Sequence, residues 1–235
     1  PAGVERSLLA WQQLSQTYGL PANSSVDLQP LTGTLNTIPP NSNTSVFLPK
    51  VGSNPNQSEE ETRESLRRFI AEWHNLLGAD LGQLSLVERT DDASGVKTAR
   101  YEQRPFRYPL RGNFGKLVIR FKADRRVVSL SSTCLPNTDR LQAALASLTP
   151  KVTSEDAATL VQQRQISALD AAGQQHSFKL VPNTEVAVRQ LVAYVLLSSD
   201  KQLLEMHLAW EIDVTNGPIK TIYVDVISEQ IIAVA

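Results

Sequence analysis

The stretch SEEETRESLRRFIAEWHNLLG, which runs from Ser58 to Gly78, decides how this chain of 235 residues begins to fold. Ser58 and Glu61 have the spacing of a capping box, in which each side chain accepts a hydrogen bond from the other residue's backbone N–H. Apolar residues then recur at helical spacing, and Gly78 is a usual type of helix end. These apolar residues are Leu66, Phe69, Ile70, Trp73, Leu76 and Leu77. The stretch predicts an amphipathic helix that packs on a core.

After this helix the period of the apolar residues falls to two, which is typical of strands with one buried face. In the segment Lys116–Lys122, Leu117 and Ile119 are expected to point to one side of a sheet and Arg120 to the other. A turn around Asp91–Gly95 and a tight hairpin at Ala123–Arg125 separate strands of this kind. The predicted strands are Gln83–Arg89, Lys97–Gln103, Lys116–Lys122 and Arg126–Ser132, and a short helix is expected over Asp139–Leu148.

The pattern then starts again. Thr153 and Asp156 form a second capping-box candidate, followed by an apolar helical face. The strands predicted after it are Ser177–Val181, Val186–Leu197, Met206–Val214, Ile219–Asp225 and Gln230–Val234. A helix followed by antiparallel strands, twice, predicts an α+β fold of two lobes, which we place at 58–150 and 151–235. It differs from the alternating strands and helices of a doubly wound nucleotide-binding fold.

Residues 1–57 precede the two predicted lobes and differ in composition from them. The first 19 residues are expected to form a helix, whose apolar stripe is Val4, Leu8, Trp11, Leu14 and Tyr18. Residues 20–57 contain only two charged residues and many Pro and Asn residues, which favours extended backbone. Apolar residues recur throughout this segment. We therefore expect an extended N-terminal arm that lies on a folded surface.

The overall composition excludes several classes of protein. Lys and Arg number 23 and Asp and Glu 24, which argues against a globally basic nucleic-acid binder. No apolar run approaches the roughly 18–20 residues that span a bilayer. Cys134 is the single cysteine, so a disulfide framework within the chain and a site of several cysteines are excluded.

No pattern of residues predicts catalysis or metal binding. The three histidines, His74, His176 and His207, have no partner at metal-ligand spacing, and the His-Glu-x-x-His motif is absent. Nucleophile and phosphate-binding glycine motifs are absent as well. We interpret Cys134 as a small buried residue. The sequence therefore predicts a protein without catalytic activity, cofactor or metal.

One segment, residues 100–126, is strongly basic and contains interleaved aromatic residues. Its nine basic residues outnumber its two acidic ones, so it has a charge of +7 in a chain of net charge −1. Three interpretations are open: a solvated outer face of a sheet above core aromatics, a surface for an acidic protein partner, or a binding site for single-stranded nucleic acid. We favour the solvated face, and nucleic acid is the least favoured of the three.

Several strand segments, taken in order, suggest a family. These segments are ARYEQ (99–103), YPL (108–110), KLVIRFK (116–122), RVVSL (126–130) and LPN (135–137), after a helix that ends in WHNLLGAD (73–80). Their order resembles the fungalysin/thermolysin propeptide domain. LAWEIDV (208–214) and IYVDV (222–226) resemble the PepSY domain that follows it in that family. The resemblance covers residues 58–235 and implies lobes of the cystatin-like and PepSY-like kinds.

The chain departs from the family pattern at three turns where glycine is usual. Arg107 takes the place of a hairpin glycine, Arg125 replaces the glycine of an Asp-Gly turn, and Glu229 replaces the glycine of the last turn. Because glycine is chosen at such positions for a positive φ, we expect these turns to have altered geometry.

The resemblance implies a non-catalytic, propeptide-like module that inhibits a thermolysin-like zinc metallopeptidase or assists its folding, in cis or in trans. It also implies an exported protein, secreted or in the periplasm or cell envelope, from which a signal peptide has been removed. Two alternatives stay open: a stand-alone envelope binding module that reuses the fold, and a binder of an anionic ligand or single-stranded nucleic acid through residues 100–126. The residues expected to contact the partner are Arg104, Phe106, Arg107, Tyr108, Arg111, Phe114 and Lys116.

Overall fold

The computed structural model describes residues 2–22, 24–38, 44–182, 184–198, 200 and 202–235. These residues form an α+β fold with five α-helices and sheets built mainly of antiparallel strands, which confirms the predicted class. The chain divides into two compact units. The first unit consists of residues 1–105 and 114–137, and the second consists of residues 106–113 and 138–235. None of the helices in the described ranges is long and apolar enough to cross a membrane.

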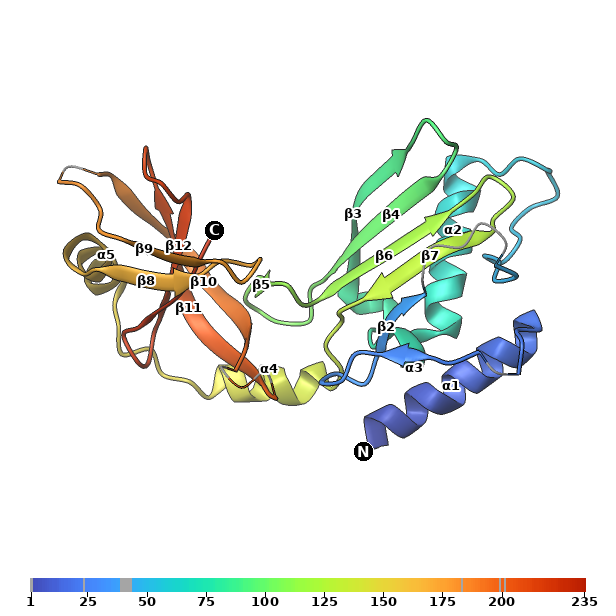
Figure 1. The fold of residues 1–235 in the computed structure, drawn as a ribbon, viewed down its shortest axis with the longest axis horizontal. Coiled ribbons are helices and arrows are strands. Elements are labelled where there is room, and N and C mark those ends of the chain that lie inside the picture. The colour runs from blue at the N-terminus through green and yellow to red at the C-terminus, as the bar shows by residue number, and fades with distance from the viewer. Residues whose placement is uncertain (1, 23, 39–43, 183, 199, 201) are drawn as a thin grey trace. The chain divides into compact units, whose positions relative to one another are not determined.

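The first unit is built on a six-stranded antiparallel sheet with the strand order β1-β2-β7-β6-β4-β3 (Figure 1). Its strands are β1 (Asp27–Leu28), β2 (Leu35–Ile38), β3 (Leu84–Asp91), β4 (Lys97–Gln103), β6 (Lys116–Phe121) and β7 (Val127–Ser132). Alternation along β6 buries Leu117 and Ile119, while Lys116 on the opposite face is exposed. The four strands predicted for this part of the chain are therefore confirmed, within one or two residues at their ends.

Helix α2 (Glu59–Glu72) covers the buried face of this sheet. Its capping box is present: the Glu61 N–H donates to Ser58 Oγ at 3.1 Å, and the Ser58 N–H donates to Glu61 Oε2 at 2.8 Å. Phe69 and Ile70 are fully buried in the same cluster as Leu117. The short helix α3 (His74–Leu77) follows and ends at Gly78, which has a positive φ of 79°. The amphipathic helix predicted from Ser58 is confirmed, with a break at Trp73.

The arm between α1 (Ala2–Tyr18) and α2 is part of this sheet and of its core. β2 pairs with β7, and β1 pairs with β2. Farther along, Val46 and Leu48 are buried, and the Leu48 N–H donates to Arg125 O at 2.9 Å. An extended arm on a folded surface is thus confirmed for the described part of residues 20–57. Residues 23 and 39–43 of the predicted arm lie outside the described residues.

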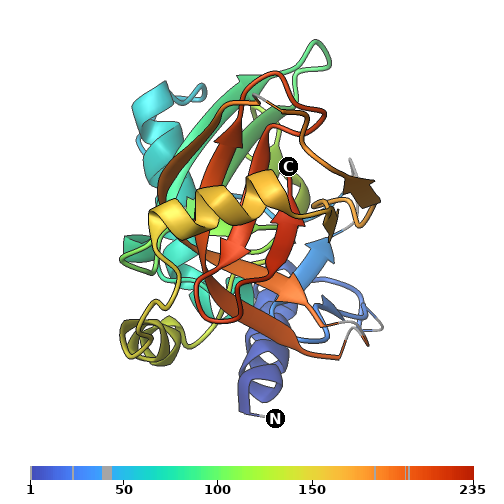
Figure 2. The same cartoon turned by 90° about the vertical axis from the view of Figure 1, so that its left-hand side faces the viewer.

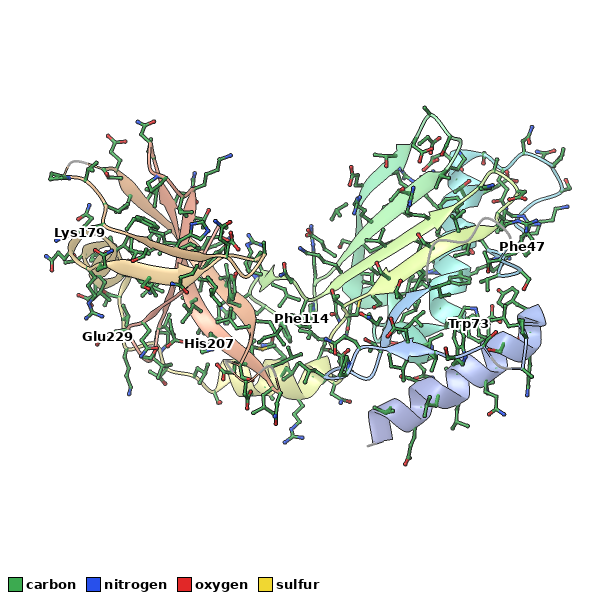
Figure 3. All side chains as sticks on the ribbon, viewed as in Figure 1. Phe47, Trp73, Phe114, Lys179, His207 and Glu229 are labelled. Carbon is green, nitrogen blue, oxygen red and sulfur yellow. The ribbon has the colours of Figure 1, made fainter. Side chains whose placement is uncertain are left out.

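Helix α1 (Ala2–Tyr18) forms as predicted, and Trp11, Leu14 and Tyr18 of the predicted stripe contact the core of the first unit. Val4 and Leu8 are 39% and 46% exposed, whereas Ala10 and Leu14 are buried in the core of the first unit. The Tyr18 ring lies 6.1 Å from the Trp73 ring, and the Tyr18 hydroxyl donates to Phe47 O (Figure 3). The apolar spacing located the helix correctly. It also identified the docked side over the second half of the helix, whereas the first two residues of the predicted stripe stay exposed.

The side chain of Gln103, at the end of β4, joins two distant parts of the first unit. Its carboxamide Nε2 donates to Leu135 O at 2.9 Å, and the Leu135 N–H donates to Gln103 Oε1 at 2.8 Å. Gln103 is 2% exposed and Leu135 3%. Because water cannot replace buried hydrogen bonds of this kind, the carboxamide fixes the segment after β7 against the end of β4.

We predict that Gln103→Ala lowers the free energy of unfolding by roughly 2–4 kcal/mol, since it leaves a buried N–H and a buried C=O of Leu135 without partners. Urea unfolding followed by tryptophan fluorescence measures the change. Gln163→Ala, at an exposed position of helix α5 (Ser154–Gln163), is the matched control and should change the free energy by less than about 0.5 kcal/mol. Equal midpoints for the two variants would contradict a structural role of the Gln103 carboxamide.

The second unit is built on a five-stranded sheet with the order β13-β12-β11-β10-β5. Its strands are β5 (Leu110–Gly112), β10 (Val186–Leu197), β11 (Leu204–Val214), β12 (Thr221–Asp225) and β13 (Ile231–Val234). Helix α5 (Ser154–Gln163) lies across one face of this sheet and buries Ala157 and Val161 against it (Figure 2). The capping box of Thr153 and Asp156 that begins α5 is present, as predicted.

The remaining elements of this unit differ from the sequence-based expectations. Helix α4 is Thr138–Ala146, and a separate hairpin pairs β8 (Ile166–Leu169) with β9 (Gln175–Phe178). No strand was predicted at β8, and the strand predicted at Ser177–Val181 starts and ends earlier in the structure. β5 was not predicted as a strand, and it pairs with β10 in parallel, unlike the antiparallel sheet expected for this lobe. The expected boundary between residues 150 and 151 falls inside the second unit.

Two turns that lack the usual glycine keep glycine-like geometry. Arg125 has a φ of 71° and Glu229 a φ of 60°, both in the left-handed region. The expectation of altered geometry is therefore wrong at these two positions. Backbone contacts hold both residues in place: Arg125 O accepts the Leu48 N–H, and Glu229 O accepts a hydrogen bond from Arg164 Nη1. A side chain with a Cβ is strained in this region by about 1–2 kcal/mol.

We predict that Glu229→Gly raises the free energy of unfolding by about 0.5–1 kcal/mol, because glycine removes the left-handed strain and loses only part of that gain to chain entropy. The ion pair of Glu229 with Arg164 is long, at 3.8 Å, and exposed, so its loss matters little. Thermal unfolding measures the shift. Glu229→Ala is the control: it removes the same side chain but keeps the strain, and it should not stabilise the protein.

Candidate protein-binding segment

Four of the seven residues predicted to contact a partner lie in the segment Phe106–Asn113, which is part of the second unit. Phe106, Tyr108 and Leu110 alternate along the segment and pack against a buried apolar cluster. This cluster consists of Leu145 of α4, Ala193 of β10, Leu208 of β11 and Val226. Because the alternation is that of a strand, one side of the segment is covered and Arg107, on the other side, is exposed.

The backbone of the segment adds a strand to the edge of the sheet. Leu110, Arg111 and Gly112 pair with Ala193, Tyr194 and Val195 of β10 in parallel register. The Ala193 N–H donates to Pro109 O at 2.9 Å. Gly112 has a φ of 97°, and a Cβ at this position would lie 2.5 Å from Val195 O. Glycine is therefore required where the segment leaves the sheet.

A partly buried ion pair fixes the side chain of Arg111. Its Nε lies 2.5 Å from Glu211 Oε2, and its Nη2 lies 3.3 Å from Glu211 Oε1. Gln190 donates a further hydrogen bond to Glu211 Oε1 at 3.0 Å, and the Tyr223 hydroxyl donates to Oε2 at 3.4 Å. Glu211 is 8% exposed. A carboxylate this buried needs a bidentate partner, which the Arg111 guanidinium supplies.

The electrostatics of this network agree with its geometry. Burial of the Glu211 carboxylate acts to raise its pKa, but the hydrogen bonds from Arg111 and Gln190 outweigh it, so the pKa lies below its usual value. Burial, and then the negative charge of Glu211, raise the pKa of Tyr223. The ring of Tyr223 lies 4.5 Å from that of Tyr194, the residue paired with Arg111. Glu211 is thus an ionised acceptor at neutral pH, and Tyr223 is a neutral donor.

The other three predicted contact residues belong to the first unit. Phe114 is buried, with 8% exposure, whereas Arg104 and Lys116 are exposed. Within the described residues, Arg104, Arg107 and Lys116 have no ion-pair partner. The seven residues are therefore divided between the two units, and most of their aromatic surface is already covered inside the protein.

The rest of the basic segment supports the interpretation as a solvated sheet face. Tyr101 and Phe121 are buried beneath the sheet of the first unit, so they offer no platform on which bases could stack. On the outer face, Arg100 forms an ion pair with Glu88 at 2.7 Å, and Arg120 one with Asp92 at 3.5 Å. Acidic residues of the neighbouring strand and hairpin therefore neutralise part of the positive charge that the linear sequence concentrates here.

A second polar pair of the five-stranded sheet was not found by sequence reasoning. His207 Nδ1 of β11 lies 2.7 Å from Asp225 Oδ2 of β12 (Figure 3 labels His207). Asp225 Oδ1 accepts the backbone N–H groups of Ile227 and Ser228, so the carboxylate also holds the following turn. His207 Nε2 lies 3.5 Å from Glu205 Oε2, which is close enough for attraction between charges. The sequence indicated this pair only weakly, because the two cross-strand neighbours are 18 residues apart.

The hydrogen bond to Asp225 raises the pKa of His207 above its usual value of 6.5, and burial opposes this only in part. Burial acts to raise the pKa of Asp225, but His207 and the two backbone amides lower it below its usual value of 3.8. The histidine's contribution to stability is complete below pH 6.5 and is lost as the pH rises through its raised pKa. The aspartate's contribution is present above pH 3.8 and is lost as the pH falls through its lowered pKa.

We predict that Asp225→Asn lowers the pKa of His207 and removes the loss of stability that accompanies its deprotonation at mildly alkaline pH. Asparagine keeps an oxygen for the two backbone amides, so the turn should persist. NMR titration of the His207 ring protons, with urea unfolding on both sides of the transition, measures the two effects. Asp124→Asn, at an exposed turn of the first unit, is the control. An unchanged His207 titration in Asp225→Asn would contradict the pairing.

Burial or local hydrogen bonds account for the surroundings of Cys134, His74 and His176. Cys134 is fully buried in the core of the first unit, as predicted, and burial raises the pKa of its thiol to about 11. His74 Nδ1 lies 2.9 Å from Ala71 O, and His176 Nε2 lies 2.9 Å from Asp170 Oδ2. Within the part of the chain that the structure describes, no group of three His, Cys, Asp or Glu side chains is placed to hold a metal ion.

Comparison with known proteins adds no relative to this description. No protein-family model matches the chain, and no curated protein matches it.

Proposed function

We propose that this chain is a non-catalytic, protein-binding module of the propeptide type, which inhibits a thermolysin-like zinc metallopeptidase or assists its folding. The observation that carries the proposal is the repeated order of elements. In the first unit, α2 precedes the antiparallel strands β3, β4, β6 and β7, and in the second α5 precedes β10 to β13. This is the order that the resembling propeptide and PepSY domains would have, with cystatin-like and PepSY-like lobes.

The contact residues are best sought among the exposed cations of the predicted set. Arg111 is held by Glu211, and Phe114 is buried, so neither offers its side chain to a partner without rearrangement. Arg104 of the first unit and Arg107 of the second are exposed and have no ion-pair partner within the described residues. Exposed cations of this kind attract an acidic protein surface and increase its rate of association.

A direct test is inhibition of thermolysin by the purified full-length chain, measured with a fluorogenic peptide substrate. We expect inhibition at up to high micromolar concentrations of the chain, with gel analysis showing that the chain stays intact. The double variant Arg104→Ala/Arg107→Ala should weaken inhibition about tenfold, or ~1.4 kcal/mol. The effect of these cations should also diminish as salt is added.

Lys122→Ala supplies the matched control for this test. Lys122 is a cation of the same basic segment, at the end of β6, and lies outside the predicted contact residues. Its variant should inhibit as strongly as the parent chain. No inhibition by the intact parent chain at high micromolar concentration would count against the peptidase as the partner. Equal losses in all variants would instead point to nonspecific charge attraction.

A further inference from the structure

The second unit is not continuous in the sequence. Its body, residues 138–235, is joined covalently to the first unit only at the bond between Asn137 and Thr138. The remaining part of the unit, Phe106–Asn113, is tethered to the first unit at both of its ends, through Pro105 and Phe114. Docking of this segment on the body is therefore a noncovalent interaction between two separately tethered parts of the chain.

The docked segment contacts one set of residues of the body, whose surface we call the groove. Phe106, Tyr108 and Leu110 enter the apolar cluster beside α4, and Arg111 pairs with Glu211. The Arg107 N–H donates to the side-chain Oε1 of Gln142 on α4, and Asn113 donates to Ala171 O. Every partner in these contacts belongs to residues 138–235. The groove would recognise the same segment equally well if it came from another copy of the chain.

The connection that must move for such an exchange is a single short stretch. Leu135 is fixed to the first unit by Gln103, and Thr138 begins helix α4, so the stretch consists of Pro136 and Asn137. Asn137 has a φ of 56°, in the left-handed region that asparagine adopts more readily than most residues with a Cβ. Short hinge connections of this kind favour exchange, because the exchanged form keeps every docking contact when the connection opens.

From this arrangement we propose that residues 138–235 of one copy dock on the segment Phe106–Asn113 of a second copy, which gives an exchanged dimer with two identical grooves. Each groove in this dimer contains the contacts of the closed chain. The balance between the two forms depends on protein concentration and on the conformation of residues 136–137, because the docking contacts cancel in the comparison. This inference is independent of the proposed peptidase partner.

Charge reversal of the partly buried ion pair tests the exchange. Arg111→Glu places two carboxylates together in a closed chain, and Glu211→Arg places two guanidinium groups together. When the two variants are unfolded, mixed and refolded, exchange pairs Glu at 111 with Arg at 211 in one groove and restores the native Arg111–Glu211 pair in the other. We expect a heterodimer by light scattering in the mixture, and less than a tenth as much dimer in either variant alone.

Two matched variants control for folding and for surface charge. Arg111→Glu/Glu211→Arg in one chain should be a folded monomer, because its closed form already has complementary charges. The second control reverses Arg189 and Asp213, an ion pair whose two members both lie in the body. Mixing Arg189→Glu with Asp213→Arg should give no heterodimer, since exchange of the segment leaves that pair within one copy. A heterodimer in this control would overturn the assignment to the groove.

A disulfide trap tests the exchange with the native charges and stays informative if the charge variants fold poorly. In a Cys134→Ser background, Leu110→Cys and Ala193→Cys are placed together in one chain, where their register predicts an internal disulfide. The two substitutions are then placed in separate chains, which are mixed, refolded at high concentration and oxidised. A covalent heterodimer supports the exchange. Formation of the internal disulfide without any heterodimer, or of monomers alone in the charge-reversal mixture, would overturn it.

Discussion

The interaction on which the fold of the first unit depends is the pair of hydrogen bonds between the Gln103 carboxamide and the backbone of Leu135. Neighbouring backbone bonds, from Gln103 N to Gly115 O and from Gly115 N to Thr133 O, lie at the same end of the sheet. The boundaries between the two units fall near residues 105, 114 and 137 of the sequence, close to these bonded residues. A side chain that both donates and accepts is needed here, because Leu135 presents one donor and one acceptor where water is excluded.

The packing of the docked segment changes the interpretation of residues 104–116. A run of aromatic and basic residues at 104–116 suggested an exposed contact surface. In the structure, the alternation of Phe106, Tyr108 and Leu110 buries one side of the run, and the buried carboxylate of Glu211 engages Arg111. The cations of the run that stay exposed are Arg104, Arg107 and Lys116. Fewer residues of the run are therefore available to a partner than the sequence suggested, since most of the run packs within the second unit.

The turns at Arg125 and Glu229 show how tertiary contacts override a local rule. Glycine is usual where φ is positive, because a Cβ is strained there. At Arg125 the backbone accepts the Leu48 N–H, and the guanidinium donates to Leu48 O at 2.8 Å. Arg125 therefore strains the turn and also attaches the arm to it. The arginine side chain supplies a hydrogen bond that glycine cannot, and this bond offsets part of the strain. The departure from the glycine pattern therefore indicates an additional contact, and the shape of the turn is unchanged.

The sequence by itself determined the elements whose causes are local. The capping boxes at Ser58 and Thr153, the apolar period of α2 and the alternation of β6 depend on residues within a few positions of one another, and all four were predicted correctly. Only the tertiary structure decided which distant residues meet. The parallel pairing of β5 with β10, the ion pair of Arg111 with Glu211 and the pair of His207 with Asp225 join residues 18 to 100 positions apart. The packing of whole sheets determines which of these residues meet. The sequence near each residue therefore does not predict its partner.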